Sequence, residues 1–210
     1  MESVITPDPR FYDCAYSVPS ENREKFKTLK RQARKALFLD RDGVINVDHG
    51  YVVKKDDFQL IPGSAELINK ATRAGYLAIV VTNQAGIGRG YYTEQDFAEI
   101  SDYMVRTLYE SGAEISAIYH CPYHPTHGIG GYKKDSFDRK PNPGMLCKAE
   151  RDFQLNLGEC LLIGDNVSDI EAGIRAKIGR SFILNLKGTA SALPEGAVRV
   201  EQLCEVGLFL

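Results

Sequence analysis

Residues 36–46, ALFLDRDGVIN, join a short apolar run to two carboxylates. The run at 36–39 is continuous and strand-like, which is typical of a strand buried inside a parallel sheet. Asp40 and Asp42 follow at once, beside Gly43, which lets the chain turn. Ligands of such sheets bind at the carboxyl ends of the strands, so we expect both carboxylates in a crevice that suits a divalent cation and a nucleophile. The alternative is an ordinary surface turn, because Asp and Gly are common in turns.

The composition is that of an ordinary globular protein, with 210 residues of which 43% are hydrophobic and 26% charged. The net charge of −2 argues against a nucleic-acid binder that works through bulk charge. No apolar run approaches the roughly 20 residues of a membrane span, and the N-terminus lacks the pattern of a signal peptide. The five scattered cysteines are typical of reduced thiols, not of a disulfide framework. We therefore expect a cytoplasmic protein that binds neither nucleic acid nor membrane.

The chain divides into an N-terminal arm, residues 1–35, and one domain, residues 36–210. Residues 1–20 contain three prolines and little periodicity, which predicts a poorly ordered segment. Residues 21–35 carry seven basic and two acidic side chains and are expected to be helical. Such a run is usually a solvated helix face or a linker, although a role in covering the sheet or contacting a partner stays open.

Strands and helices are expected to alternate from residue 36 onward. The β-rich apolar runs lie at 36–39, 77–81, 115–119, 160–163 and 181–184, and the helical patterns near 63–74, 93–111, 143–154 and 168–177. Thr93 and Asn142 are the expected caps of the second and third helices. This order predicts an α/β protein with a doubly wound, Rossmann-like parallel sheet. The irregular stretch 120–142 is long for a compact domain, which favours a functional loop.

Other predicted strands also end in residues suited to phosphate chemistry. The strand at 77–81 is followed by TNQAGIGRG, residues 82–90, whose hydroxyl, amides and glycines suit a loop that approaches an anion. Gly164-Asp165-Asn166 ends another strand, and the Arg139-Lys140 pair comes just before a helix start. Each feature alone is common. Their order, however, places all of them at one edge of a doubly wound sheet.

This combination resembles the haloacid dehalogenase (HAD) superfamily of phosphotransferases, and the resemblance implies its fold. It also implies that Asp40 is the nucleophile, which forms an aspartyl-phosphate, and that Asp42 is the general acid and then the base. Thr82 and Lys140 would hold the transferring phosphoryl group. These roles meet the needs of phosphoester hydrolysis, namely an in-line nucleophile, charge neutralisation and proton transfer.

The resemblance further implies a magnesium ion, held by the Asp40 carboxylate, the backbone carbonyl of Asp42 and Asp165. Carboxylate, carbonyl, phosphate and water oxygens are the ligands that this hard cation prefers. Asp169 is expected to orient the water shell of the cation or Lys140. The alternative for Asp169 is an ordinary helix cap or surface acid.

Within the superfamily, the chain resembles the D-glycero-D-manno-heptose 1,7-bisphosphate 7-phosphatase family over about residues 36–190. The resemblance rests on DRDGVINVDHGYV (40–52), TNQAGIGRGYYTE (82–94), CPYHP (121–125), RKPNPGM (139–145) and GDNVSD (164–169). It implies removal of the 7-phosphate in nucleotide-activated heptose and lipopolysaccharide biosynthesis.

The same resemblance implies a set of substrate-binding residues: Asp48, His49, Gly50, Tyr51, Asn83, Gln84, Ala85, Arg139 and Asn166. Arg139 would recognise the second phosphate or the sugar, and Asn166 stands where the family often has Lys. A pocket for a sugar bisphosphate also needs further cations and neutral donors. Residues that could supply them are Arg139, Arg89, His49, Tyr51, Asn83 and Gln84. Taken singly, Tyr51 could be core packing, Arg89 a solvated charge and His49 a turn residue. The chain leaves little room for a large cap domain, so we expect the site to be closed only by loops. We also expect the protein to be a monomer.

One departure from the family pattern concerns zinc. Relatives carry a Cys-x-His pair and a later Cys-x-Cys pair, and here Cys121 is the one family-type ligand. The other three positions hold Tyr123, Ser136 and Asp138. Structural zinc needs four N or S ligands, so we expect none, with packing and hydrogen bonds holding the loop. An improvised site of Cys121, His124 and His127 is the alternative.

Three other functions compete with the sugar phosphatase. Histidinol-phosphate phosphatase is a related activity on the same scaffold, against which the DHGYV segment argues. A polynucleotide 3′-phosphatase would have only the basic run at 23–35 as a nucleic-acid patch. A non-catalytic HAD-fold binding protein is disfavoured because Asp40, Asp42 and Asp165 are all present.

Overall fold

A computed structural model describes residues 16–17, 35–184 and 193–210. These residues form a seven-stranded sheet in the order β1-β4-β3-β2-β5-β6-β7. The strands are β1 (Tyr16–Ser17), β2 (Ala36–Leu39), β3 (Leu77–Asn83), β4 (Ala117–Cys121), β5 (Leu161–Gly164), β6 (Arg180–Leu184) and β7 (Ala197–Val200). All neighbouring pairs are parallel except β1 with β4. The predicted arm lies outside the described residues, apart from β1 and Lys35, so the basic helix stays a prediction.

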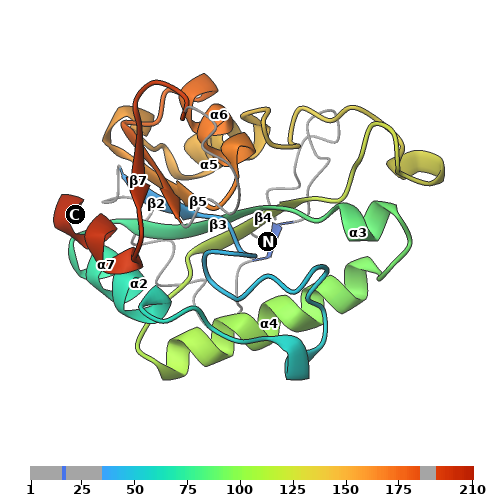
Figure 1. Ribbon diagram of the computed structural model, residues 1–210, viewed down its shortest axis with the longest axis horizontal. Coiled ribbons are helices and arrows are strands. Elements are labelled where there is room, and N and C mark those ends of the chain that lie inside the picture. Colours follow the sequence, from blue (N-terminus) through green and yellow to red (C-terminus); the bar gives the residue numbers. More distant parts are fainter. Residues whose placement is uncertain (1–15, 18–34, 185–192) are drawn as a thin grey trace, which may run out of the picture.

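Helices cover both faces of the sheet (Figure 1). They are α2 (Ser64–Arg73), α3 (Ala85–Gly88), α4 (Glu94–Glu110), α5 (Gly144–Phe153), α6 (Val167–Arg175) and α7 (Leu203–Val206). Helices α2 and α4 lie on one side, and α5 and α6 on the other. The α/β doubly wound fold predicted from the sequence is confirmed, with no large cap domain on the described part of the chain. None of the helices described is long and apolar enough to cross a bilayer.

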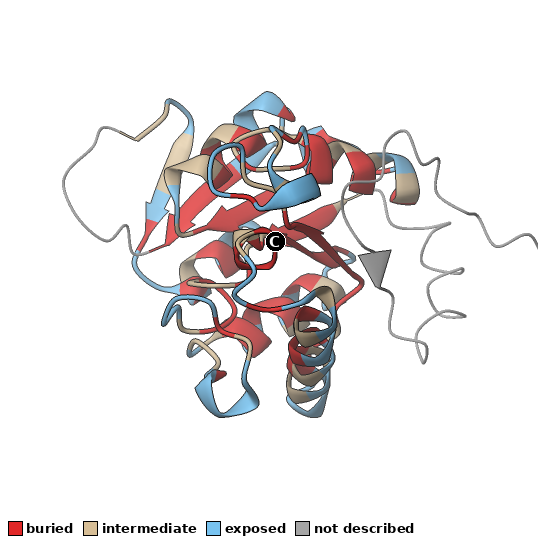
Figure 2. Ribbon diagram, turned by 90° about the vertical axis from the view of Figure 1, so that its right-hand side faces the viewer, coloured by how far each residue is buried: buried red, intermediate tan, exposed pale blue. Residues whose placement is uncertain are grey.

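The central strand β2 is buried because helices pack on both of its faces. Leu37 and Leu39 join the core under α2 and α4, while Ala36 and Phe38 join the core under α5. All four side chains are fully inaccessible to solvent, which explains why the strand is continuously apolar instead of alternating. Figure 2 shows buried residues concentrated in the sheet and on the inner helix faces.

The chain leaves β2 at the switch point of the sheet. Strand β2 pairs with β3 on one side and with β5 on the other, both in parallel. The loops that follow these three strands therefore open into one crevice at their carboxyl ends, which is where ligands of doubly wound sheets bind. The fold thus brings together segments that are more than 100 residues apart in the sequence.

One helix cap was predicted correctly, whereas several other local predictions were inexact. Thr93 caps α4 in a capping box with Asp96, as its position predicts. Asn142 is not the cap of α5: Pro143 occupies that position, and the Asn142 side chain donates to the Ser136 carbonyl instead. The predicted strand 115–119 lies two residues too early, because β4 runs on through the buried Cys121. Strand β7 was missed because its sequence, AVRV, is short and only its last residue, Val200, is buried.

Candidate active site

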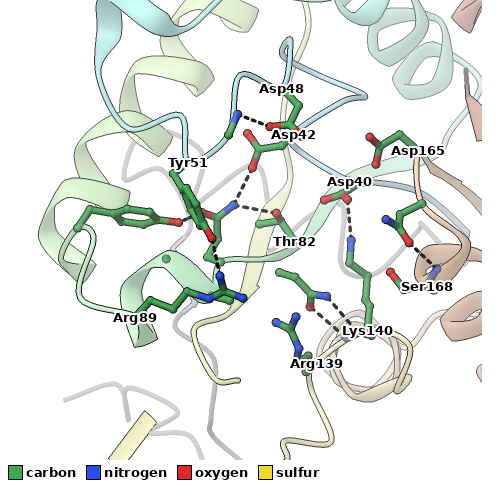
Figure 3. A pocket seen from close by; sticks show the side chains of 17 residues that line it. Asp40, Asp42, Asp48, Tyr51, Thr82, Arg89, Arg139, Lys140, Asp165 and Ser168 are labelled. Carbon is green, nitrogen blue, oxygen red and sulfur yellow. Dashed lines mark hydrogen bonds and ion pairs between the residues drawn. The ribbon is translucent and has the colours of Figure 1, made fainter. Parts of the chain in front are cut away.

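A cavity of about 500 Å³ opens at the carboxyl ends of β2, β3 and β5 (Figure 3). It has the size of a small-molecule site. Its lining includes most of the predicted site residues: Asp40, Asp42, Asp48, Gly50, Tyr51, Thr82, Asn83, Gln84, Ala85, Arg139, Lys140, Asp165 and Asn166. His49 is exposed and is not among the lining residues of this cavity.

Asp40 sits at the base of the cavity, one residue beyond β2. Its backbone N–H donates to the Ile163 carbonyl over 2.9 Å, which extends the pairing with β5 and fixes the carboxylate. One carboxylate oxygen accepts from the Arg41 N–H at 2.7 Å, and the other lies 3.0 Å from Lys140 Nζ. Burial raises the pKa of Asp40 to about 7: the attraction of Lys140 opposes this rise, and the repulsion of neighbouring carboxylates adds to it.

Lys140 is the cation that balances this cluster. Its side chain is 3% exposed, and Nζ contacts Asp40, Asp169 Oδ1 at 2.5 Å and the Val81 carbonyl at 2.8 Å. Burial alone would lower the pKa of Lys140, but the carboxylates of Asp169 and Asp40 outweigh it and raise that pKa. The ammonium group is therefore charged. Asn83 holds the lysine backbone from both sides, since it accepts from Lys140 N–H and donates to the Lys140 carbonyl. Although Asn83 lines the cavity, its amide thus positions Lys140.

Three carboxylates converge beside this lysine. Asp40, Asp165 and Asp169 each offer an oxygen, and these atoms lie within 4.8 Å of one another; within the described ranges they are the one such group of potential metal ligands. Burial raises the pKa of Asp165 to about 6, with repulsion from Asp169 as the next cause. A methyl group at Gly43, where φ is +84°, would overlap the Asp165 carboxylate. Gly43 is therefore needed for the close approach of Asp165 as well as for the turn.

Asp169 contacts Lys140 and also takes part in the N-terminal cap of α6. One oxygen pairs with Lys140, and the other accepts from the Asn166 backbone N–H in the capping box of α6. The residue is 1% exposed, so it is not a surface acid. Asn166 in turn accepts from the Ser168 N–H as the helix cap, while it also lines the cavity.

Asp42 faces the cavity at the centre of a donor network. Asn46 Nδ2 donates to its Oδ1 and Gln84 Nε2 to its Oδ2, each over 3.0 Å, and Arg41 contacts both oxygens. Gln84 Nε2 also donates to Thr82 Oγ1, so the threonine hydroxyl proton is free to point at a bound anion. Tyr92 fixes the orientation of this amide, because its hydroxyl donates to Gln84 Oε1 at 2.5 Å. Tyr92 was missed from the sequence, where it reads as an ordinary core aromatic.

The far wall of the cavity is cationic and aromatic. Arg89 Nη1 donates to the Tyr51 hydroxyl over 2.9 Å, and Tyr51 has the left-handed backbone angle φ of 56°. Asp48 accepts from the Gly50 N–H and so shapes the same loop. Arg139 donates to the Tyr123 carbonyl at 3.2 Å. Arg89 and Arg139 both line the cavity. Burial lowers the pKa of Arg139, and repulsion from the nearby Arg89 lowers it further.

The loop that contains Cys121, where the family resemblance raised the question of zinc, is held by hydrogen bonds. Burial raises the pKa of this thiol to about 11, against smaller opposing contributions from hydrogen bonds with the Tyr123 backbone and the Ser136 side chain. Ser136 is buried and accepts from the Asp138 N–H at 3.2 Å. His124 Nδ1 accepts from the N–H groups of residues 126 and 127. The absence of structural zinc stays a prediction from the sequence.

This arrangement can bind and cleave a phosphate ester. It combines a carboxylate that could act as a nucleophile, Asp40, with a second carboxylate in the same cavity, Asp42, and with a lysine and a hydroxyl that could bind phosphoryl oxygens. Three clustered carboxylates offer hard oxygen ligands to a divalent cation. The remaining guanidinium groups leave one end of the cavity suited to a second anionic group.

Comparisons with known proteins agree with this chemistry. A family model for haloacid dehalogenase-like hydrolases matches residues 9–177. The D-glycero-alpha-D-manno-heptose-1,7-bisphosphate 7-phosphatase of Burkholderia mallei is 55% identical over 150 residues, which cover 71% of this chain and 79% of the relative. The D-glycero-beta-D-manno-heptose-1,7-bisphosphate 7-phosphatase of Pasteurella multocida is 43% identical over 151 residues, or 72% of this chain and 82% of the relative.

A solved structure is similar in fold as well. The crystal structure of D,D-heptose 1,7-bisphosphate phosphatase from B. bronchiseptica, complexed with magnesium and phosphate, superposes with a TM-score of 0.72. The two proteins are 32% identical, and the match covers 83% of this chain and 96% of that one.

Proposed function

Since this chain belongs to the haloacid dehalogenase-like hydrolases and is a phosphoric monoester hydrolase, we propose that it removes the 7-phosphate of D-glycero-D-manno-heptose 1,7-bisphosphate. One observation carries this proposal: the cavity combines a phosphoryl-transfer set with two guanidinium groups, those of Arg89 and Arg139, and neither is in an ion pair with a carboxylate of the described residues. A bisphosphate has one anionic end for each. The names of the relatives in Burkholderia mallei and Pasteurella multocida support the same substrate class.

We infer a mechanism in two displacements. The Asp40 carboxylate attacks phosphorus in line, and the bond between phosphorus and the ester oxygen breaks to give an aspartyl-phosphate. Asp42 donates its proton to the departing sugar oxygen. A water molecule then attacks the phosphorus of the aspartyl-phosphate and transfers one of its protons to the Asp42 carboxylate. The bond between phosphorus and Asp40 breaks, which releases inorganic phosphate and restores Asp40. Lys140 and Thr82 neutralise and orient the phosphoryl oxygens throughout.

A magnesium ion fits this site. The donor set consists of carboxylates, two of which have pKa values raised by burial and by repulsion from neighbouring carboxylates, as expected where the single cation Lys140 faces several carboxylates. Asp40, Asp165 and the backbone carbonyl of Asp42 would hold the ion, with Asp169 supporting Lys140 beside it. When bound, magnesium would supply further charge neutralisation at the phosphoryl group.

The sugar would lie between the two ends. Asp48, Gly50, Tyr51, Gln84 and Ala85 all line the cavity and offer donors and acceptors for sugar hydroxyls next to an aromatic ring. Arg139, with Arg89 beside it, would receive the second phosphate. We place the protein in the cytoplasm as a monomer, in nucleotide-activated heptose biosynthesis.

Phosphate release tests the proposal directly. Heptose 1,7-bisphosphate and histidinol phosphate are offered to the wild-type protein, with magnesium and with chelator. The proposal predicts magnesium-dependent turnover of the heptose, with little of histidinol phosphate. Asp40→Asn should abolish turnover, while Asp102→Asn, the same change at an exposed position on α4, should leave it unaltered. A preference for histidinol phosphate would contradict the substrate, and turnover by Asp40→Asn would contradict the nucleophile.

A further inference from the structure

Arg41 lies between Asp40 and Asp42 in the sequence and is not among the residues that line the cavity. It is 1% exposed, although it is one of the largest charged side chains. Nε and Nη2 contact both oxygens of Asp42, at distances of 2.8 to 3.1 Å. A buried guanidinium group on a carboxylate in this forked arrangement fixes the plane of the carboxylate as well as its position. Neither the mechanism above nor the comparisons give Arg41 a role.

A second set of contacts links Arg41 to the substrate loop. Nη2 also donates to the Val52 carbonyl over 2.9 Å, directly after the predicted sugar-binding segment 48–51. Arg41 Cζ lies 5.5 Å from the centroid of the Phe97 ring. That ring packs at a tilt against His120, with the two ring centroids 4.3 Å apart. The side chain is therefore held on one side by α4 and on the other by Asp42 and the loop.

We propose that Arg41 is a positioning residue, which holds the Asp42 carboxyl in line with the leaving oxygen and ties it to the loop that binds the sugar. The proposal rests on the proposed role of Asp42 as proton donor. Arg41 itself gives and takes no proton: the proton passes from Asp42 to the leaving oxygen, and later from water to Asp42. The function of Arg41 is to fix where that transfer occurs.

Stability alone is a weak explanation for this arrangement. Burying a guanidinium group costs desolvation energy, which a carboxylate partner offsets only partly, so a well-packed apolar residue would often be equally stable. Asn46 and Gln84 already satisfy hydrogen-bond acceptors of Asp42. What the forked contact adds is orientation. Misplacement of a reacting group by about 1 Å can cost on the order of 10²-fold in rate.

Leaving-group dependence separates orientation of the acid from general structural support. A leaving group of low basicity, such as p-nitrophenolate, departs without a proton, whereas a sugar alkoxide needs one. The probes are a series of substituted phenyl phosphates of increasing phenol pKa. The readout is kcat/KM, which reports the steps up to departure of the leaving group. The variants are Arg41→Gln, Arg41→Lys, Asp42→Asn and the exposed control Arg106→Gln, all with magnesium present.

We expect Arg41→Gln to lose roughly 10²-fold in kcat/KM on the most basic phenols and only a few-fold on p-nitrophenyl phosphate. Its plot of log kcat/KM against leaving-group pKa should therefore be steeper than that of the wild type. Arg41→Lys, which keeps the charge but loses the fork, should lie between the two. It also tests the proposal if Arg41→Gln does not fold. Arg106→Gln should match the wild type.

A uniform loss across the whole series in both Arg41 variants would overturn the proposal, because it would indicate structural support only. Asp42→Asn distinguishes this failure from a failure of the proposed mechanism. If Asp42→Asn steepens the plot but the Arg41 variants do not, the positioning role is wrong and the acid is right. If Asp42→Asn does not steepen it, the assignment of the acid itself is wrong. The aryl series needs no assumption about the natural sugar.

Discussion

Magnesium binding should release protons from the carboxylate cluster at mildly acidic pH. In the metal-free protein the pKa of Asp40 is raised to about 7 and that of Asp165 to about 6. At pH 6, Asp40 is then about nine-tenths protonated and Asp165 about half. Because a metal ligand must be ionised, binding should release about 1.4 protons at pH 6 and about 0.1 at pH 8. The apparent magnesium affinity should accordingly rise about 20-fold between these pH values.

Calorimetric titration with magnesium at pH 6, in buffers of different ionisation enthalpy, measures the released protons directly. Asp40→Asn is the matched variant, because it removes the group with the higher pKa and should release only about half a proton at pH 6. Heats that are independent of buffer, with equal affinity at pH 6 and pH 8, would refute the reasoning. Such a result would mean that both carboxyls are already ionised without metal.

The same shifts fix how the stability of the metal-free protein depends on pH. The ordinary pKa of an Asp carboxyl is 3.8, so between about pH 4 and 7 the folded state binds more protons than the unfolded chain. The free energy of unfolding should therefore fall as pH rises through that window, opposite to the usual behaviour of salt-bridged carboxylates. Urea denaturation at pH 5 and pH 7 with chelator checks the direction. Magnesium should remove most of the loss at pH 7.

Further substitutions test the packing around the site. Gly43→Ala forces a methyl group onto Asp165 at positive φ, so we expect a loss of stability of at least about 1 kcal/mol and a higher magnesium requirement for turnover, whereas wild-type magnesium dependence would contradict the close approach. Tyr92→Phe leaves the buried Gln84 carbonyl without its donor, which should cost about 1–3 kcal/mol in urea denaturation and slow the hydrolysis of alkyl phosphates. Ile100 on α4 is only 1% exposed, so Ile100→Ala should open a cavity beneath the helix. We expect the free energy of unfolding to fall by about 2–5 kcal/mol, while the folded fraction keeps its specific activity.

The base of the site could be predicted from the sequence because its residues stand at strand ends. Asp40, Thr82 and Asp165 follow or end apolar runs, and a parallel sheet brings such positions together whatever the detailed packing. Lys140 was a harder case, since it comes from a long loop and not from a strand. Its position just before a helix start drew attention to it, but its role came only from the family pattern. The contacts that hold it, from the side chain of Asn83 and the carbonyl of Val81, are long-range.

What the sequence did not indicate is the support behind the reacting groups. Arg41 and Tyr92 are buried polar side chains whose role depends on which atoms the fold places beside them, and no periodicity reports that. Asn83 lines the cavity, so its contact with the substrate stays a prediction; the sequence did not indicate that its amide also binds the Lys140 backbone on both edges. In each case the sequence shows the residue type but does not show which atoms its side chain will hydrogen-bond. Sequence patterns locate groups along strands, whereas hydrogen-bond partners are set by tertiary packing.

This difference has a consequence for the division of labour within the site. The backbone places the proposed reacting carboxylates and Lys140 at strand and loop ends. The contacts that orient them come from Arg41, Gln84 and Asn83, which lie in the segments 40–42 and 82–84. Each of these supporting residues is within two positions of a residue that it helps to orient, or hydrogen-bonds to its backbone directly. The segments 40–42 and 82–84 therefore each carry a reacting group together with part of its own support.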